Sequence, residues 1–568
     1  MLRVAPKAPS PDPREQALAK TLSLPPLVAR VLLARGLDDP ERIRAFLRPD
    51  LSSLSDPFLF RDMRKAVERI RQAIRRGESI LVHGDYDVDG ISGTVLLQKF
   101  FRLIHADVRP FIPMRLDGYS FGPSSIEAVK AGNHRLVISV DNGTNACEAI
   151  DEIQGLGCDV IVTDHHGTSE NVASSFAMLN PRLPDAGYPD RDLAGVGVAF
   201  RLATAVAESL GQGLLRTPEF ADFLLDAMAC VALGTIADVA PLIGENRVLT
   251  YHGLRALAQS RNPGIRALLD SAGLSHRSPE VEDIAFRIAP LINAAGRMGD
   301  AMQAVELLTA PGYSEAQAAA KILESQNEER RRVERKLQDE VMPQARDSDA
   351  AGIVLAGDDW HPGVLGIVAA RIAEETGKPA ILISFHDDIG RGSGRCPQGL
   401  HLRNALAECS RHLRSHGGHA AAAGLEIHRG SLEAFKLDFD RACREMAEND
   451  AAASIDGCAT LAELDPDSVR RMEMLGPFGM GHRRPRFLTT SLRTVGHPST
   501  DMRGQALRIR VAQNGHVLPA RMPRAARRFE EIRNAKGNWT AVHTPRTNAR
   551  GEEGPIHLEI HELIPEHD

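Results

Sequence analysis

Four side chains that can bind a metal ion follow one short apolar run at alternate positions. Residues 80–82 are apolar, and His83, Asp85, Asp87 and Asp89 come directly after them. If the backbone there is extended, its two-residue period places all four side chains on one side. Carboxylates crowded on one face repel one another unless a cation lies between them. One such aspartate is typical of a turn or a helix cap, but the four together indicate a metal site.

The same arrangement recurs twice along the chain. Apolar, β-branched runs occupy residues 136–140 and 160–163, and the side chains that follow them are Asp141, Asp164, His165 and His166. Such runs, alternating with helical segments, favour a parallel, doubly wound sheet, in which ligands bind outside the carboxyl ends of the strands. A helix cap would explain one aspartate. Three strands that each end at an aspartate on the same edge indicate a shared site.

A further aspartate, Asp238, follows a very apolar helical segment at 219–236. Alone it is typical of a cap or a salt-bridge partner, and only the need for another carboxylate makes it a candidate. The candidate metal ligands are then His83, Asp87, Asp89, Asp141, His165 and Asp238. Imidazole and carboxylate without thiolate suit Mn²⁺ or Mg²⁺ better than structural zinc. So many acids imply two divalent cations, a pair that catalyses hydrolysis of phosphoesters or phosphoanhydrides.

The composition predicts a soluble protein of several domains. A length of 568 residues corresponds to roughly three or four domains of ~150 residues. The seven cysteines are scattered and form no Cys-x-x-Cys pair, so neither a disulfide framework nor a zinc ribbon is predicted. The sequence shows no signal peptide and no apolar run long enough to span a bilayer. A reducing, cytoplasmic setting without a membrane is therefore expected.

Charge is distributed unevenly along the chain. The whole chain has a net charge of −7, which argues against coating nucleic acid by bulk charge. Residues 483–546, in contrast, contain fourteen basic and three acidic residues, for a local net charge of +11. A solvated surface could use either sign of charge equally well. The near absence of acids favours an anionic partner for this segment.

The expected elements place these side chains in a larger frame. Helices are expected over residues 14–48 (with a break at 24–26), 62–76, 91–104, 145–155, 194–210, 219–236 and 313–346. The last is long and charged, as in an interdomain spacer. A second α/β region restarts with strands near 352–356 and 380–384. Alternating runs at 506–511 and 557–560 predict short antiparallel strands near the C-terminus.

Two glycine-rich stretches in the second region suit a phosphate chain. In residues 392–395 and 417–419, the absence of side chains lets backbone N–H groups approach phosphate oxygens, while Arg395 and His419 add charge. Either stretch alone is typical of a tight turn. Together with Arg297, they favour a role in binding substrate phosphates.

The order of these motifs resembles the DHH phosphoesterase superfamily, and within it the RecJ family of single-strand-specific 5′→3′ exonucleases. The resemblance is carried by HGDYDVDG (83–90), DNG (141–143), DHH (164–166), LINAAGRM (291–298), SGRC (393–396) and GGHAAAAG (417–424). It covers almost the whole chain. It implies a doubly wound α/β DHH domain, a connecting helix, a second α/β DHH-associated domain and a C-terminal all-β OB-like barrel. The implied bounds are 1–60 for a helical lead-in, then 61–312, 313–346, 347–452 and 453–568.

The resemblance also assigns roles at the site. It implies that His83, Asp87 and Asp141 hold one cation, and that Asp89, Asp141, His165 and Asp238 hold the other. Asp85 would then either support the direct ligands from behind or take part in proton transfer with the metal-bound water. Asp164 would orient an imidazole, and His166 would face the scissile phosphate. Arg115, Arg297, Ser393, Arg395 and His419 would bind the strand, chiefly its 5′ end.

The implied function is degradation of single-stranded DNA to mononucleotides in DNA repair and recombination. The implied partners are single-stranded DNA, a single-strand-binding protein and a helicase, and the implied state is a monomer. Two other readings stay open: a DHH enzyme for pyrophosphate, oligoribonucleotides or cyclic dinucleotides, and a non-catalytic DNA-binding scaffold. Local departures from the family pattern at Ser120, Cys396 and His482 concern strand binding rather than metal chemistry.

Overall fold

The chain forms two compact units. The computed structural model describes residues 12–118, 120–168, 171–397, 399–445, 455–501, 506–523, 525, 528–534, 537–548 and 554–566. Within them, the terminal unit comprises the residues up to Leu54, the segment Pro241–Ile243 and the residues from 455 onward. The central unit comprises Ser55–Ala240 and the residues from Gly244 to 445. Four basic residues of the 483–546 segment, Arg503, Arg524, Arg527 and Lys536, lie outside the described residues.

The first sheet of the central unit is entirely parallel. Its strands are β1 (Ile80–Gly84), β2 (Val108–Phe111), β3 (Leu136–Val140), β4 (Asp159–Thr163) and β5 (Ala177–Leu179). They are arranged in the order β2-β1-β3-β4-β5, with Ile80 beside Leu136 and Leu136 beside Asp159. The continuous burial of β1 and β3 explains why both read as unbroken apolar runs.

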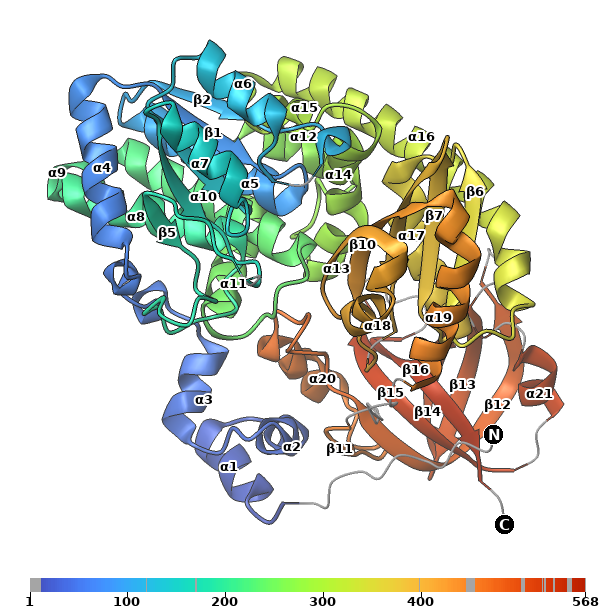
Figure 1. Cartoon of the computed structure of the whole chain (residues 1–568). Helices are drawn as coiled ribbons and strands as arrows, with labels where there is room; N and C mark the ends of the chain where they lie inside the picture. Colours follow the sequence, from blue (N-terminus) through green and yellow to red (C-terminus); the bar gives the residue numbers. More distant parts are fainter. Residues whose placement is uncertain are drawn as a thin grey trace. The chain divides into compact units, whose positions relative to one another are not determined.

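Helices cover this sheet on both sides (Figure 1). Their bounds are α4 (Met63–Arg76), α5 (Val88–Leu103), α6 (Pro123–Ala131), α7 (Cys147–Gly155), α8 (Gly195–Leu210), α9 (Gln212–Leu215) and α10 (Pro218–Ala237). α5 packs against both α8 and α10, whereas α6 packs against α7. α5, α8 and α10 have buried residues around much of their circumference, which is why their sequences are apolar well beyond one stripe.

Helices also connect the first sheet to the second. They are α11 (Gly244–Gln259), α12 (Pro263–Ser271), α13 (Val281–Asp283), a π-helical turn (Ile284–Ile288), α14 (Ala289–Met298), α15 (Met302–Leu308) and α16 (Tyr313–Arg346). α16 has the predicted bounds, with Pro343 inside its last turn. It packs against α12, α14 and α15 and also against α17 (Pro362–Thr376). The connecting helix is therefore packed along its length within the central unit.

The second sheet is mixed. Its strands β6 (Ile353–Asp358), β7 (Ala380–His386), β8 (Ile389–Arg395), β9 (Leu413–Gly418) and β10 (Ala422–His428) have the order β6-β7-β8-β10-β9. Only the β6–β7 pair is parallel. α18 (Leu402–Glu408) and α19 (Leu432–Glu445) complete this α/β region, and the interior of its core contains Phe435 and Phe439.

The terminal unit contains a closed five-stranded barrel. β12 (Phe487–Thr500), β13 (Leu507–Gln513), β14 (His516–Met522), β16 (Ile556–Pro565) and β15 (Trp539–Thr547) pair in that order, and β15 pairs back onto β12. A short strand, β11 (Gly457–Cys458), pairs in parallel with the start of β12. The helices are α1 (Glu15–Leu22), α2 (Pro26–Ala34), α3 (Pro40–Leu47), α20 (Pro466–Met472) and α21 (Phe529–Asn534).

The N-terminal helices share a core with the barrel. Leu27, Val28 and Leu32 of α2 lie in one apolar cluster with Phe487 and Leu558 of the barrel. Ion pairs add to this packing. The Arg30 guanidinium contacts both Glu15 and Glu463 at 2.8 Å, and the Arg35 Nε contacts the Asp456 carboxylate at 2.9 Å.

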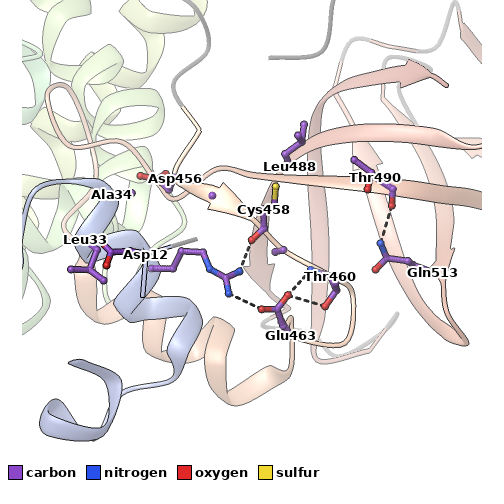
Figure 2. Close-up of a pocket in the computed structure, with 13 residues that line it drawn as sticks. Asp12, Leu33, Ala34, Asp456, Cys458, Thr460, Glu463, Leu488, Thr490 and Gln513 are labelled. Carbon is purple, nitrogen blue, oxygen red and sulfur yellow. Dashed lines mark hydrogen bonds and ion pairs between the residues drawn. The ribbon is translucent and has the colours of Figure 1, made fainter. Parts of the chain in front are cut away.

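A pocket lies where α2 meets β11 and β12 (Figure 2). Asp12, Asp456 and Glu463 line it together with Thr460 and Gln513. Glu463 accepts hydrogen bonds from the backbone N–H and the hydroxyl of Thr460, both at 2.8 Å. Gln513 donates to the carbonyl of Thr490 at 2.8 Å. The contact across the junction is made by Arg30 of α2, which donates to Glu463.

The predicted fold class is confirmed, with two adjustments. α5 begins at Val88 rather than at residue 91, so the acidic stretch is not extended throughout. α10 is long and apolar enough to span a membrane by length and composition, contrary to the expectation from the sequence, but 67% of its apolar window is buried. Such a buried helix is typical of a globular core. The division of the chain into five parts stays a prediction.

Burial of His543 in the barrel predicts a loss of stability in mild acid. Its side chain is fully buried, and burial lowers its pKa to about 3. The stability gained from the neutral buried ring is fully present above the unfolded-state pKa of ~6.5. It is lost as the pH falls toward 3, by up to about 1.4 kcal/mol per pH unit. We expect His543→Leu to flatten this dependence. The free energy of unfolding is measured in urea at pH 5 and 7 in a Trp360→Phe background, where Trp539 is the only tryptophan. An equal change in this free energy between the two pH values, with and without His543→Leu, would contradict the prediction.

Candidate active site

The loop after β1 divides the acidic stretch between two kinds of structure. Asp85 follows the strand directly, whereas Asp87 is the N-cap of α5 and accepts hydrogen bonds from the N–H groups of Asp89 and Gly90 at 2.9 and 3.2 Å. Asp89 itself lies in the first turn of the helix. The simple alternation expected from the sequence is therefore wrong beyond Asp85, because a helix cap turns the backbone and aims each carboxylate separately.

Asp141 occupies the corresponding position after β3. Its backbone has a φ of 63°, in the left-handed region that aspartate and asparagine tolerate better than most residues. Its carboxylate is 1% exposed. The Oδ1 atom lies 3.1 Å from Nε2 of His165 and 3.7 Å from Nδ1 of His166. The ends of β3 and β4 thus bring Asp141 against both imidazoles.

Asp164 holds the segment after β4 in place. Its Oδ1 accepts from Nδ1 of His166 at 2.8 Å and from the backbone N–H of His165 at 2.7 Å, and its Oδ2 accepts from the N–H of Thr144 at 2.9 Å. Burial disfavours the ionised carboxylate, but the hydrogen bonds from His166 and Thr144 outweigh it and lower the pKa of Asp164. The same hydrogen bond raises the pKa of His166 to about 9, against the effect of burial. Asp164 therefore orients His166.

The structure gathers these side chains into three potential ligand groups. In each group, the candidate ligand atoms lie within 4.8 Å of one another. The groups are Asp85 with Asp87 and Asp141, Asp89 with His165 and Asp238, and Asp141 with His165 and His166. Asp238 comes from the C-terminus of α10, and its Oδ2 is 3.6 Å from Nε2 of His165. Asp141 and His165 each occur in two of the groups.

The carboxylates of these groups destabilise one another when no cation is present. Burial raises the pKa of Asp85 and of Asp141, and neighbouring aspartates raise them further. For the same two reasons the pKa of Asp89 rises to about 7 and that of Asp238 to about 8. A cluster of this kind fits a hard divalent cation, because only positive charge can compensate so many buried acids.

His83 lies outside these three groups. Its Nε2 is 2.9 Å from the hydroxyl of Ser125, and its ring stacks on Phe121 with centroids 4.1 Å apart. Burial lowers its pKa to about 4, so the ring is neutral. Its Nδ1 is buried and has no hydrogen-bond partner among the described residues. A neutral imidazole can bind a metal ion through its unprotonated ring nitrogen.

Two glycines that have no role in the sequence predictions, Gly195 and Gly234, leave room for the Asp141 and Asp89 carboxylates. A Cβ at Gly195 would lie 2.7 Å from Cβ of Asp141, and a Cβ at Gly234 would lie 2.4 Å from Oδ1 of Asp89. Gly195 also begins α8, where its N–H and that of Val196 donate to the Asp89 carboxylate at 2.8 and 3.0 Å. In the sequence, Gly195 stands in the stretch LAGVGVAFRL (193–202) and Gly234 stands four residues before Asp238.

We expect Gly195→Ala to impair catalysis while leaving the fold intact. The added methyl group would displace the Asp141 carboxylate, and a misplacement of about 1 Å at a catalytic site costs roughly 10²-fold in rate. The measurement is kcat on single-stranded DNA with circular dichroism of the folded chain. Gly155→Ala is the matched control, because a Cβ there meets nothing within 4 Å. A wild-type rate in Gly195→Ala would contradict this reading.

A cluster of arginines lies close to the acidic loop. Arg297 donates to the carbonyl of Gly363 at 2.7 Å, and Arg115 stacks on the Tyr86 ring at 3.9 Å while donating to the carbonyl of Gly296 at 3.3 Å. Burial and then the charges of Arg115 and Arg395 lower the pKa of Arg297 to about 9. A half-buried group of arginines that repel one another is a candidate anion site.

The second sheet completes this anion site. Arg395, at the end of β8, donates to the hydroxyl of Ser393 at 3.1 Å. A Cβ at Gly366 in α17 would lie 2.6 Å from Nη2 of Arg395, so a glycine is needed there. The His419 ring stacks near His166, with centroids 5.9 Å apart. All the substrate-binding residues predicted from the sequence thus lie near the acidic groups or the arginine cluster.

Arg182 is a further charged residue that the sequence reading did not assign. Its charge helps to lower the pKa of His165 and of His419. At Asp238 the same charge partly opposes the rise in pKa. Arg182 stands in the stretch LNPRLPD (179–185). Its position beside the acidic groups is the kind of position that a phosphate-binding arginine takes.

Comparison with known proteins places this site in the DHH family. Residues 79–231 match the family model of the DHH family N-terminal domain, and residues 349–445 match the DHHA1 domain. Residues 455–562 match the RecJ OB domain. The parallel sheet with its acidic strand ends, and the second sheet with its arginine, are therefore the two parts of a DHH protein.

The relatives narrow the family further. The chain is 33% identical to the single-stranded-DNA-specific exonuclease RecJ of Escherichia coli (strain K12), over 82% of this chain and 83% of that one. It is 34% identical to RecJ of Bacillus subtilis (strain 168), over 83% of this chain and 60% of that longer one. A crystal structure of RecJ from Thermus thermophilus in complex with Mn²⁺ covers 99% of this chain and 79% of that one at 29% identity, with a TM-score of 0.83. The chain belongs to the RecJ family.

Proposed function

We propose that this protein is a metal-dependent exonuclease that degrades single-stranded DNA from its 5′ end to mononucleotides. The observation that carries the proposal is the presence, in one unit, of a buried acidic cluster and a half-buried arginine cluster that both contact the segment 84–90. The Tyr86 ring of that loop contacts Arg115, while its aspartates belong to the acidic groups. The named activity of the relatives and the Mn²⁺ complex of the Thermus protein support the same function.

The acidic groups would hold two divalent cations, Mn²⁺ or Mg²⁺. The ligands would be His83, Asp87, Asp89, Asp141, His165 and Asp238, with Asp141 bridging; the position of Asp85 beside Asp87 and Asp141 adds it to the first set. The chemistry supplied there by bound cations is activation of a water and neutralisation of charge on the phosphate. Asp164 would keep His166 directed at the scissile phosphate through their 2.8 Å hydrogen bond.

The arginine cluster would receive the 5′ end of the strand. Arg115, Arg297 and Arg395 present guanidinium groups with no carboxylate hydrogen-bonded to any of them among the described contacts. Ser393 and His419 complete the polar lining. An anion site beside the catalytic groups would select one end of a strand and thereby impose the polarity of cleavage.

The barrel of the terminal unit would bind the strand beyond the cleavage site. OB folds bind single strands through a basic groove, and residues 455–562 match the RecJ OB domain. Two basic residues of the 483–546 segment are paired with acids that lie outside it, Arg483 with Asp456 and Arg484 with Glu473. The effective charge is thus lower than the +11 counted from the sequence. We propose a cytoplasmic monomer that works in DNA repair and recombination with a single-strand-binding protein and a helicase.

The decisive experiment is digestion of single strands labelled at either end. We expect a 5′-labelled DNA strand to release labelled mononucleotide first, and a 3′-labelled strand to shorten progressively, with Mn²⁺ or Mg²⁺. Duplex DNA, RNA, pyrophosphate and cyclic dinucleotides serve as competing substrates. Release of the 3′ label first would overturn the polarity, and faster cleavage of a small substrate would favour the other class of DHH enzyme.

A further inference from the structure

The residue after Asp238 has an unusual backbone conformation. α10 ends in a Schellman-type turn, in which the N–H of Ala240 donates to the carbonyl of Thr235 and the N–H of Val239 donates to that of Ile236, both at 3.2 Å. Val239 occupies the left-handed position with a φ of 59°, where glycine is usual. Its side chain is 56% exposed, so burial does not repay the strain of a β-branched residue there.

The chain then enters the terminal unit for three residues. Pro241–Ile243 clusters with the barrel and not with the flanking residues of the central unit. The N–H of Leu242 donates to the carbonyl of Met480 at 2.8 Å. A Cβ at Gly481 would lie 3.2 Å from Cβ of Pro241, so the two backbones are in close contact. This segment is therefore fastened to the loop around Gly481.

The receiving loop is itself firmly held within the terminal unit. The backbones of Gly479 and His482 bond to each other at 2.9 and 3.2 Å. The buried ring of His482 stacks on Phe478 with centroids 5.4 Å apart, and its Nε2 is 2.8 Å from the carbonyl of Leu475. This is the loop in which His482 departs from the family pattern. If the loop is displaced, it would therefore move as one unit and carry Leu242 with it.

We propose that residues 239–242 form a tether through which DNA bound to the terminal unit positions the Asp238 carboxylate. The inference rests on the proposed function, because it takes Asp238 as a metal ligand and the barrel as a DNA-binding surface. Asp238 is four residues from Leu242, and the strained turn between them leaves little slack to absorb a movement. DNA binding and cation binding are then thermodynamically linked, and each strengthens the other by the same factor.

The test measures Mn²⁺ binding by electron paramagnetic resonance, with and without a closed circular single strand that has no 5′ end to enter the arginine cluster. In the full-length wild type, we expect the circle to tighten Mn²⁺ binding severalfold. Inserting Gly-Gly between Ala240 and Pro241 is expected to abolish this change while circle affinity, measured by anisotropy without metal, stays within twofold. The same insertion between Asp387 and Asp388, at an exposed hairpin tip, is the control and is expected to retain the linkage.

A second variant guards against misfolding of the insertion. Val239→Gly accepts the left-handed conformation without strain and loosens the link, so it is expected to reduce the linkage factor. Wild-type linkage in both variants, or no linkage in the wild type, would overturn the tether. Absence of Mn²⁺ binding by the wild type would instead overturn the proposed function. Normal Mn²⁺ binding and cleavage by the wild type, together with wild-type linkage in both variants, would overturn the tether alone.

Discussion

The Asp141→Asn variant is expected to lose nuclease activity by at least about 10³-fold, well beyond the 10–100-fold effect of changes outside the ligand shell. Asp141 is the carboxylate shared by two of the three ligand groups, so its loss affects both cation positions. Asparagine is preferred to alanine for this test because it accepts the φ of 63° at this position. The measurement is nucleotide release from single-stranded DNA with saturating Mn²⁺.

A second readout separates this effect from misfolding. Asp141 is buried against other carboxylates, so removing its charge relieves repulsion in the metal-free protein. We expect the metal-free variant to melt at a higher temperature than the metal-free wild type, and to gain less from added Mn²⁺. Asp151→Asn, on the exposed face of α7, removes the same charge elsewhere and is expected to change neither property. Full activity in Asp141→Asn would overturn the cation assignment.

The Arg297→Gln variant is expected to lose the preference for a 5′-phosphorylated end. Arg297 is half-buried beside Arg115 and Arg395, and their mutual repulsion is relieved when an anion binds. Removing one guanidinium from such a site is expected to lower kcat/KM for 5′-phosphorylated DNA by about 10²-fold, equivalent to about 2.8 kcal/mol. For strands with a 5′-hydroxyl, we expect a much smaller loss. The measurement is kcat/KM for both strands.

Inhibition by inorganic phosphate provides an independent check on the same site. Free phosphate is expected to compete with 5′-phosphorylated DNA in the wild type and to compete less in Arg297→Gln. Arg335→Gln, on the exposed side of α16, is the matched control. An equal loss for both kinds of DNA end would show that Arg297 acts in general strand binding or stability, and not in recognition of the 5′ phosphate.

Much of the fold could be predicted because the relevant signals are local. The apolar runs of β1, β3 and β4 and the long charged pattern of α16 determine their elements without help from distant residues. The convergence of Asp141, Asp164 and His165 also follows from local rules, since parallel strands place their carboxyl ends on one edge. These parts of the site needed only strand ends and a topology.

What the sequence could not predict depends on contacts between distant segments. The capping role of Asp87 begins a helix within the acidic stretch and redirects Asp89 toward α8. Gly195 matters because its backbone meets Asp141, 54 positions earlier in the chain. The packing of α2 against β12 joins segments more than 400 residues apart. No local pattern encodes these approaches.

The shared core of α1–α3 and the barrel makes the central unit an insertion within the terminal unit. A ribosome adds about 5–20 residues per second, so the apolar face of α2 waits roughly half a minute to two minutes for its barrel partners. Long-range closure of this kind is slow and leaves hydrophobic surface open to chaperones and proteases meanwhile. A chain that ended before the barrel would expose the apolar face of α2, because the residues that cover this face belong to the barrel. Quality control could thus remove a catalytic unit that had lost its means of holding DNA.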